Sequence, residues 1–263
     1  MTERSDDLAV FAPWLARWRL LPDGAPFASQ WSRLLPVRRG GAPLMLKAAM
    51  AEQEVAGSRF LQALDGQGAV RVFEREADAV LMERAAGAHR LGDLDEDEAL
   101  ETLCGVGDAI HSAGRAAIYD GLVPLDRWLD TLPGAALERG GTFVQAAGTA
   151  QRFLATTVEM RPLHGDLHHG NVLDAGERGW LAIDPKGLLG DRAFDHALMA
   201  IAPDPVAAQA PGVLRRRAGT IGRMTDLEPG RLLDWVFVQA SLYAAWYGPS
   251  DDLWPAVAAA ARR

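Results

Sequence analysis

Two polar side chains stand five residues apart in the segment His164-Gly165-Asp166-Leu167-His168-His169-Gly170-Asn171. A carboxylate such as that of Asp166 is suited to orient an attacking hydroxyl group and to accept its proton. A carboxamide oxygen such as that of Asn171 is suited to hold a magnesium ion against nucleotide phosphates. These residue types at this spacing indicate transfer of a phosphoryl group.

A second carboxylate follows a predicted hairpin. Strands are predicted at 171–174 and 180–184, with a glycine-containing turn at 175–179. Because a hairpin brings its two ends together, we expect Asp184 beside Asn171, where their oxygens form a magnesium site. Lys186 lies two residues further on, and the pattern leaves open whether it contacts phosphate or acceptor or only braces the loop.

The first part of the chain offers a cation for the opposite wall of a phosphate site. Lys47 ends a strand predicted at 43–47, and Glu54 lies in a helix predicted at 50–64, where it is expected to pair with Lys47. Only Lys47 and Lys186 are lysines among the 27 basic residues. An ammonium group differs from a guanidinium group in shape and hydration, so this bias suggests that lysine is needed at both positions.

The elements around these residues change in type along the chain. Strands are predicted at 30–37, 43–47, 70–74 and 79–83, and the apolar stretch Trp14–Leu20 is grouped with them, whereas long helices are predicted at 97–117 and 142–159. We therefore expect an α+β, bilobal fold. Residues 1–86 form a small antiparallel-sheet lobe with one main helix, and residues 87–263 form a larger, mostly helical lobe. At the junction, backbone groups of Met82, Glu83 and Ala85 are expected to face an adenine edge.

The histidine–aspartate–asparagine spacing agrees with the catalytic loop of kinases, H-R-D-L-x-x-x-N, with Gly165 in place of the arginine. Together with the segment Gly179–Asp191, it makes the chain resemble the aminoglycoside phosphotransferase family. The finer resemblance is to the branch of streptomycin 6-kinases and hydroxyurea phosphotransferases, over about residues 18–246.

This resemblance implies a protein-kinase-like fold that binds ATP and Mg²⁺ between its lobes. It implies that Asp166 is the catalytic base, that Asn171 and Asp184 are metal ligands, and that Lys47 holds the α- and β-phosphates. Asp195 matches a family aspartate that supports the catalytic loop. The nucleotide loop, at about 23–29, lacks a glycine-rich motif, so its residues stay unassigned.

The acceptors of that family are cationic aminocyclitols, with streptomycin foremost. The net charge is −8, and all the excess acidity lies in residues 87–263, which suits a cationic acceptor, although solubility is the simpler explanation of charge alone. An acidic chain is also a poor partner for nucleic acid. We expect His168 to face the γ-phosphate, and we expect His169, Asp234 and Trp246 at the acceptor.

Three alternatives stay open at this stage: a kinase of another metabolite such as hydroxyurea, a catalytically silent nucleotide-binding regulator, and a zinc hydrolase that uses the histidines of 164–169. The single cysteine excludes an internal disulfide and favours a reducing compartment. No signal peptide and no apolar run of membrane-spanning length is visible. We expect a cytoplasmic monomer with a small-molecule acceptor.

Overall fold

The computed structural model describes residues 8–29, 31–114, 116–157 and 159–263. Its first part is a six-stranded antiparallel sheet with the path β1-β3-β4-β6-β5, in which β2 pairs with β3. The strands are β1 (Leu21–Pro22), β2 (Phe27–Ala28), β3 (Ser32–Arg39), β4 (Ala42–Ala49), β5 (Val72–Glu76) and β6 (Ala79–Glu83). The four strands predicted in this region all belong to this sheet.

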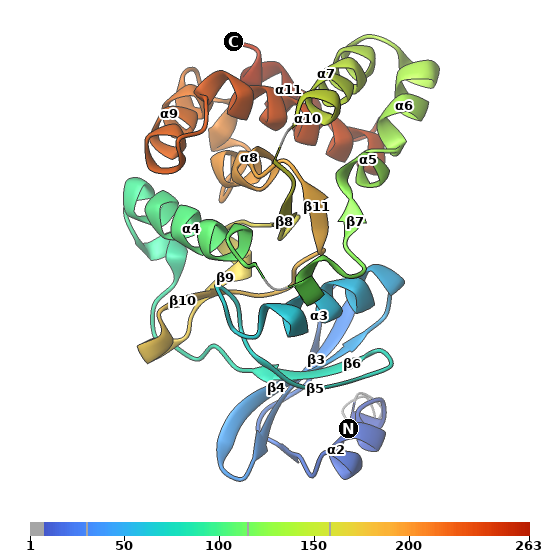
Figure 1. Cartoon of the computed structure of the whole chain (residues 1–263), viewed down its shortest axis with the longest axis vertical. Coiled ribbons are helices and arrows are strands. Elements are labelled where there is room, and N and C mark those ends of the chain that lie inside the picture. Colours follow the sequence, from blue (N-terminus) through green and yellow to red (C-terminus); the bar gives the residue numbers. More distant parts are fainter. Residues whose placement is uncertain (1–7, 30, 115, 158) are drawn as a thin grey trace.

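Helix α3 (Glu52–Leu64) lies between the sheet and the helical part of the molecule (Figure 1). Its Phe60, Leu61 and Leu64 are buried in the main hydrophobic core, which continues into the second lobe. The antiparallel sheet, this helix and the helical second part together form the expected α+β, protein-kinase-like fold.

The expectation of a strand within Trp14–Leu20 is wrong, because α2 occupies Ala12–Arg17. Phe11 and Trp18 are buried with Leu35 and Val37 of β3 in a second, smaller core. Apolar residues at 8, 11, 14, 15 and 18 follow the spacing of one helix face, which covers the side of the sheet opposite α3 (Figure 1).

The second part of the chain is mostly helical. Its helices are α4 (Glu96–His111), α5 (Leu125–Trp128), α6 (Thr131–Arg139), α7 (Thr142–Thr156), α8 (Ala193–Ile201), α9 (Val213–Thr225), α10 (Pro229–Tyr247) and α11 (Leu253–Ala261). Helix α10 packs against α7, α8, α9 and α11, and its Trp235 and Phe237 are fully buried. Within the described residues, no helix has the length and apolar character needed to span a membrane.

Short strands hold the loops that carry the polar residues. The predicted hairpin forms from β9 (Val172–Asp174) and β10 (Trp180–Ala182). A second small sheet, missed in the sequence, pairs β11 (Leu188–Gly190) with β7 (Val123–Pro124) and with β8 (Arg161–Leu163). Loops 164–171 and 183–187 run between these two small sheets, so both loops are anchored at each end.

Candidate active site

The loop at 164–171, here called the catalytic loop, is held in place by the side chain of Asp195 of α8. The two carboxylate oxygens of Asp195 accept hydrogen bonds of 2.7 Å each from the backbone N–H groups of His164 and Gly165. His111 of α4 lies 2.9 Å from the same carboxylate through Nε2. Burial opposes ionisation, but the His111 hydrogen bond and the nearby histidine charges prevail and lower the pKa of Asp195. The structure thus shows the loop support that the resemblance implied.

The ring of His164 links the catalytic loop to loop 183–187. Its Nε2 donates to the carbonyl oxygen of Ile183 at 2.8 Å, so Nδ1 is free to accept the backbone N–H of Asp166 at 3.2 Å. Burial lowers the pKa of His164, which agrees with a neutral ring in this role. His164 is therefore structural, and it fixes the backbone of Asp166 relative to Ile183.

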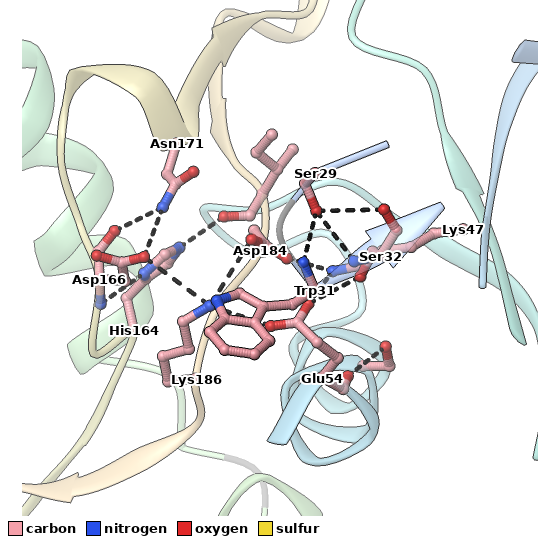
Figure 2. A network of polar contacts seen from close by, with 12 residues as sticks. Ser29, Trp31, Ser32, Lys47, Glu54, His164, Asp166, Asn171, Asp184 and Lys186 are labelled. Carbon is pink, nitrogen blue, oxygen red and sulfur yellow. Dashed lines mark hydrogen bonds and ion pairs between the residues drawn. The ribbon is translucent and has the colours of Figure 1, made fainter. Parts of the chain in front are cut away.

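Asp166 and Asn171 lie in contact. Asn171 Nδ2 donates to the Asp166 carbonyl oxygen at 2.8 Å and to its Oδ2 at 3.2 Å, and it lies 3.2 Å from His168 Nε2. Figure 2 shows the Asn171 side-chain oxygen on the side away from Asp166. The backbone N–H of Ile183 donates to the backbone carbonyl oxygen of Asn171 at 2.8 Å. The hairpin therefore brings Asp184, the next residue, close to Asn171, as expected.

Asp184 has a left-handed backbone conformation with φ of 59°. Its carboxylate forms ion pairs with Lys47, through a short hydrogen bond, and with Lys186, whose Nζ is 3.7 Å away. Burial alone would raise the pKa of Asp184, but the two ammonium groups outweigh it and lower the pKa to about 2. An ionised carboxylate beside a carboxamide oxygen fits the oxygen ligands that Mg²⁺ prefers.

Glu54 of α3 completes the cluster from the first lobe. Its Oε2 accepts from Lys47 Nζ at 2.6 Å and from Ser32 Oγ at 3.2 Å. Its Oε1 is 3.2 Å from Lys186 Nζ (Figure 2). Lys47 and Glu54 are both buried, and their ion pair joins β4 to α3. This pairing holds the Lys47 ammonium group next to Asp184.

Two cavities meet at this cluster, since Ser29 and Asp184 line both of them. The smaller, about 200 Å³, lies between the lobes and is lined by Lys47, Met82 and Asn171 with the apolar side chains Phe27, Leu34, Leu61, Val80 and Ile183. It suits a flat apolar ring with phosphates at one end. Sequence reasoning left Phe27 and Ser29 unassigned, because the loop that carries them has no glycine-rich motif.

The larger cavity, about 990 Å³, opens on the other side of Asp184. Its polar lining includes Asp166, His168 and Lys186, and its far wall is aromatic, with Trp128, Tyr243, Trp246, Tyr247 and Trp254. The Trp246 ring stands nearly perpendicular to those of Trp128 (88°) and Tyr243 (81°). The sequence singled out Trp246 but not Trp128 or Trp254, which reach this wall from α5 and α11.

Five expected site residues do not line either cavity, although one of them, Glu54, binds the two lysines that do. Among the described residues, His169 Nδ1 is buried without a hydrogen-bond partner, and burial, with the positive charge of Arg217, lowers the pKa of His169 to about 4. Asp234 pairs with Arg262 at 2.5 Å in a separate hollow. The Glu83 side chain is bound by Arg178, and Ala85 packs against the main core. His169 and Asp234 therefore do not reach the larger cavity, where acceptor contacts were expected, and Asp234 is paired with Arg262 instead.

The zinc alternative also fails on geometry. Across residues 8–29, 31–114, 116–157 and 159–263, the group of His, Cys, Asp or Glu side chains close enough to hold a metal ion is Asp108, His111 and His196, with ligand atoms within 4.8 Å of one another. This group contains none of the four residues His164, Asp166, His168 and His169.

Comparison with known proteins agrees with this geometry. Residues 17–250 match the family described as aminoglycoside/hydroxyurea antibiotic resistance kinase. The chain belongs to this family. It is therefore a phosphotransferase, and the resemblance found in its sequence is confirmed.

Relatives of this family cover most of the chain. The chain is 45% identical to streptomycin 3''-kinase of Klebsiella pneumoniae, over 89% of this chain and 90% of that protein. It is 30% identical to streptomycin 6-kinase of Streptomyces griseus, over 90% and 82%. Among solved structures, a thermostable mutant of aminoglycoside phosphotransferase APH(4)-Ia, in complex with ADP and hygromycin B, matches with a TM-score of 0.64 at 15% identity, over 97% and 98% of the two chains. That structural match supports the kinase-like fold.

Proposed function

We propose that this chain is an ATP-dependent kinase that transfers the γ-phosphoryl group to a hydroxyl group of streptomycin or a closely related cationic aminocyclitol. The observation that carries the proposal is the convergence of Lys47, Asp166, Asn171 and Asp184 at the junction of two cavities. One cavity suits a nucleotide and the other suits an acceptor, so a phosphoryl group is able to pass between them.

In this proposal the smaller cavity holds the nucleotide. The adenine ring packs between Leu34 and Ile183 near Met82, and backbone groups of residues 83–85 face its edge. Lys47, held by Glu54 at 2.6 Å, binds the α- and β-phosphates. Asn171 and Asp184 would hold Mg²⁺, which neutralises charge on the phosphates when bound.

Asp166 is the proposed base. It orients the acceptor hydroxyl in line with the γ-phosphorus and takes up the hydroxyl proton as the new oxygen–phosphorus bond forms. Asn171 holds the Asp166 carboxylate through Nδ2, and His168, which lines the larger cavity, lies 3.7 Å from that carboxylate through Nε2. These contacts keep the base directed into the larger cavity.

The aromatic wall supplies the proposed acceptor contacts. Trp246 is 43% exposed and Tyr247 is 57% exposed, so ring surface is available to a ligand. Aromatic faces attract guanidinium and ammonium groups, and Asp130 adds a negative charge to the same wall. The greater identity to the streptomycin 3''-kinase than to the 6-kinases favours the 3''-hydroxyl as the phosphorylated group.

The test is phosphoryl transfer by the purified protein with Mg-ATP and a panel of streptomycin, other aminoglycosides and hydroxyurea. We expect turnover with streptomycin and a product whose phosphate position is read by NMR. Turnover with hydroxyurea alone would favour the alternative suggested by a hydroxyurea phosphotransferase of Kitasatospora aureofaciens, 34% identical over 70% of this chain. Binding of Mg-ATP without turnover of any acceptor would favour a silent regulator.

Asp166→Asn tests the base. Loss of general-base catalysis lowers kcat by about 100-fold to 10,000-fold, and Mg-ATP binding persists because Asp166 is not a proposed nucleotide ligand. The control is Asp78→Asn, an exposed carboxylate in the β5–β6 turn, which leaves kcat unchanged. A kcat for Asp166→Asn within threefold of wild type would refute the assignment.

A further inference from the structure

The only two lysines of this chain meet at one carboxylate. Lys47 Nζ is 2.6 Å from Glu54 Oε2, and Lys186 Nζ is 3.2 Å from Glu54 Oε1. Of the 27 basic residues, the other 25 are arginines. Figure 2 shows the two ammonium groups arriving from different lobes on either side of Asp184.

The two lysines face different cavities. Lys47 lines the smaller cavity and Lys186 lines the larger one, beside Asp166. Lys186 Nζ is 3.7 Å from Asp184 Oδ2 and 3.9 Å from Asp166 Oδ2. Its ammonium group therefore lies between the proposed base and the proposed metal ligand, where the transferred phosphoryl group must pass.

The backbone fixes this position. Lys186 N donates to the carbonyl oxygen of His164 at 2.6 Å, which joins loop 183–187 to the catalytic loop. Gly187 follows with φ of +69°, a conformation that glycine adopts without strain, and it turns the chain into β11. The Lys186 side chain is consequently anchored at its base and 11% exposed at the cavity.

A lysine that only holds its loop in place needs one carboxylate partner. Lys186 Nζ lies within 4 Å of three carboxylates, which come from α3, the catalytic loop and loop 183–187. With both lysines, the cluster contains two positive and three negative side chains. A triphosphate adds further negative charge at this place, so a cation on the acceptor side is required to offset it. A compact ammonium with three rotatable donors suits oxygens that approach from several directions, whereas a guanidinium presents its donors in one plane.

We propose that Lys186 binds the γ-phosphoryl group during transfer and is the second catalytic cation of the site, a role that rests on the proposed kinase function. The acceptor oxygen forms a bond to the γ-phosphorus and loses its proton to Asp166. The bond from the γ-phosphorus to the β,γ-bridging oxygen breaks, and its electron pair stays on ADP. Lys186 keeps its protons, leaves Glu54 and offsets charge on the γ-phosphoryl oxygens.

The first test compares two nucleotides on Lys186→Met. We expect the Kd of a non-hydrolysable Mg-ATP analogue to rise about tenfold and that of Mg-ADP to change less than twofold, with kcat lower by about 100-fold to 1,000-fold. Lys186→Arg does not restore kcat. Arg216→Met, which removes an exposed partner of Glu96, is the control and retains wild-type values. An equal loss of both affinities would show a brace, and an unchanged analogue affinity would overturn the proposal.

The second test uses wild-type protein and so does not depend on folding of a variant. Reductive methylation with formaldehyde, read by mass spectrometry, reports the accessibility of both lysines. We expect Mg-ADP to protect Lys47 alone and the Mg-ATP analogue to protect both. Equal protection of Lys186 by the two nucleotides, or none by the analogue, would overturn the proposal. If wild-type protein bound no nucleotide, the kinase function itself would fail, whereas an active enzyme with an unprotected Lys186 would reject this inference alone.

Discussion

Asp195 determines where the catalytic loop lies, although it does not reach either cavity. Its two oxygens serve two consecutive backbone N–H groups at 2.7 Å and a histidine at 2.9 Å. The side chain is 1% exposed, so no water replaces a lost contact. An ionised acceptor bound by three donors is worth more than a neutral one, and the loop position depends on that charge.

Asp195→Asn is therefore expected to lower the free energy of unfolding by about 3 kcal/mol, because the amide offers one neutral acceptor and brings donors towards backbone N–H groups. Urea denaturation measures the loss, and kcat falls with it as Asp166 shifts. Asp204→Asn is the matched control: Asp204 also accepts from two backbone N–H groups, of Val206 and Ala207, but in an exposed turn. A loss at Asp195 no larger than at Asp204 would contradict this account.

At the scale of elements, α3 and loop 183–187 approach each other more closely than a side chain allows. An ideal Cβ on Gly57 would lie 1.9 Å from the carbonyl oxygen of Pro185. The same helix carries Glu54, and the same loop carries Asp184 and Lys186. The absence of a side chain at Gly57 thus sets the distance between the first-lobe carboxylate and the second-lobe ammonium and carboxylate groups.

Gly57→Ala forces α3 away from Pro185, so we expect a lower Tm and a fall in kcat/KM of at least tenfold. Gly105→Ala is the matched control, since Gly105 also lies in a helix but has open space at its Cβ position. There, alanine is expected to stabilise the protein by about 0.5–1 kcal/mol through its higher helix propensity. Equal Tm shifts for the two variants would show that the close contact is not restrictive.

The sequence predicted the elements whose own residues carry the signal. The hairpin at 171–184, the strand that carries Lys47 and the helix with Glu54 were recognised from alternation, spacing and turn residues, although this strand continues to Ala49 and does not end at Lys47. The sheet of β7, β8 and β11 was missed, because its strands have two or three residues each and are stabilised by partners far apart in the chain.

We propose the boundary between the two lobes at residues 86/87, because the backbone N–H of Gly87 already donates to the backbone carbonyl oxygen of Asp174 in the second lobe.

At the scale of the molecule, charge was a poor guide to the acceptor site. The second lobe holds all the excess acidity, yet the carboxylates that line the larger cavity are Asp130, Asp166 and Asp184, beside the cations Arg127 and Lys186. Asp234 was expected there from its charge, whereas it is paired with Arg262 elsewhere. The net charge of a lobe does not tell which cavity each carboxylate faces. The aromatic wall is assembled from α5, α10 and α11, which are far apart in the chain, so it is recognised only in the folded structure.

The stability of the whole chain is expected to depend on pH through buried histidines. His196 is fully buried, its Nδ1 donates to the Arg192 carbonyl oxygen at 2.9 Å, and its ring lies 5.2 Å from that of His111. Burial, together with the nearby charge of His111, lowers the pKa of His196 to about 3, despite the opposing effect of Asp195. In the unfolded chain the histidine pKa is about 6.5.

Between these two pKa values the unfolded chain binds a proton that folded His196 does not, so the free energy of unfolding rises with pH by about 1.4 kcal/mol per unit from this residue. The contribution is fully present above about pH 6.5 and is lost as the pH falls towards 3. Urea denaturation at pH 4.5, 5.5 and 7 measures the slope. His196→Gln should reduce it by that amount whatever its effect at pH 7, whereas His89→Gln, at an exposed position, should leave it unchanged. An identical slope in His196→Gln and wild-type protein would mean that His196 takes up its proton equally readily in the folded state.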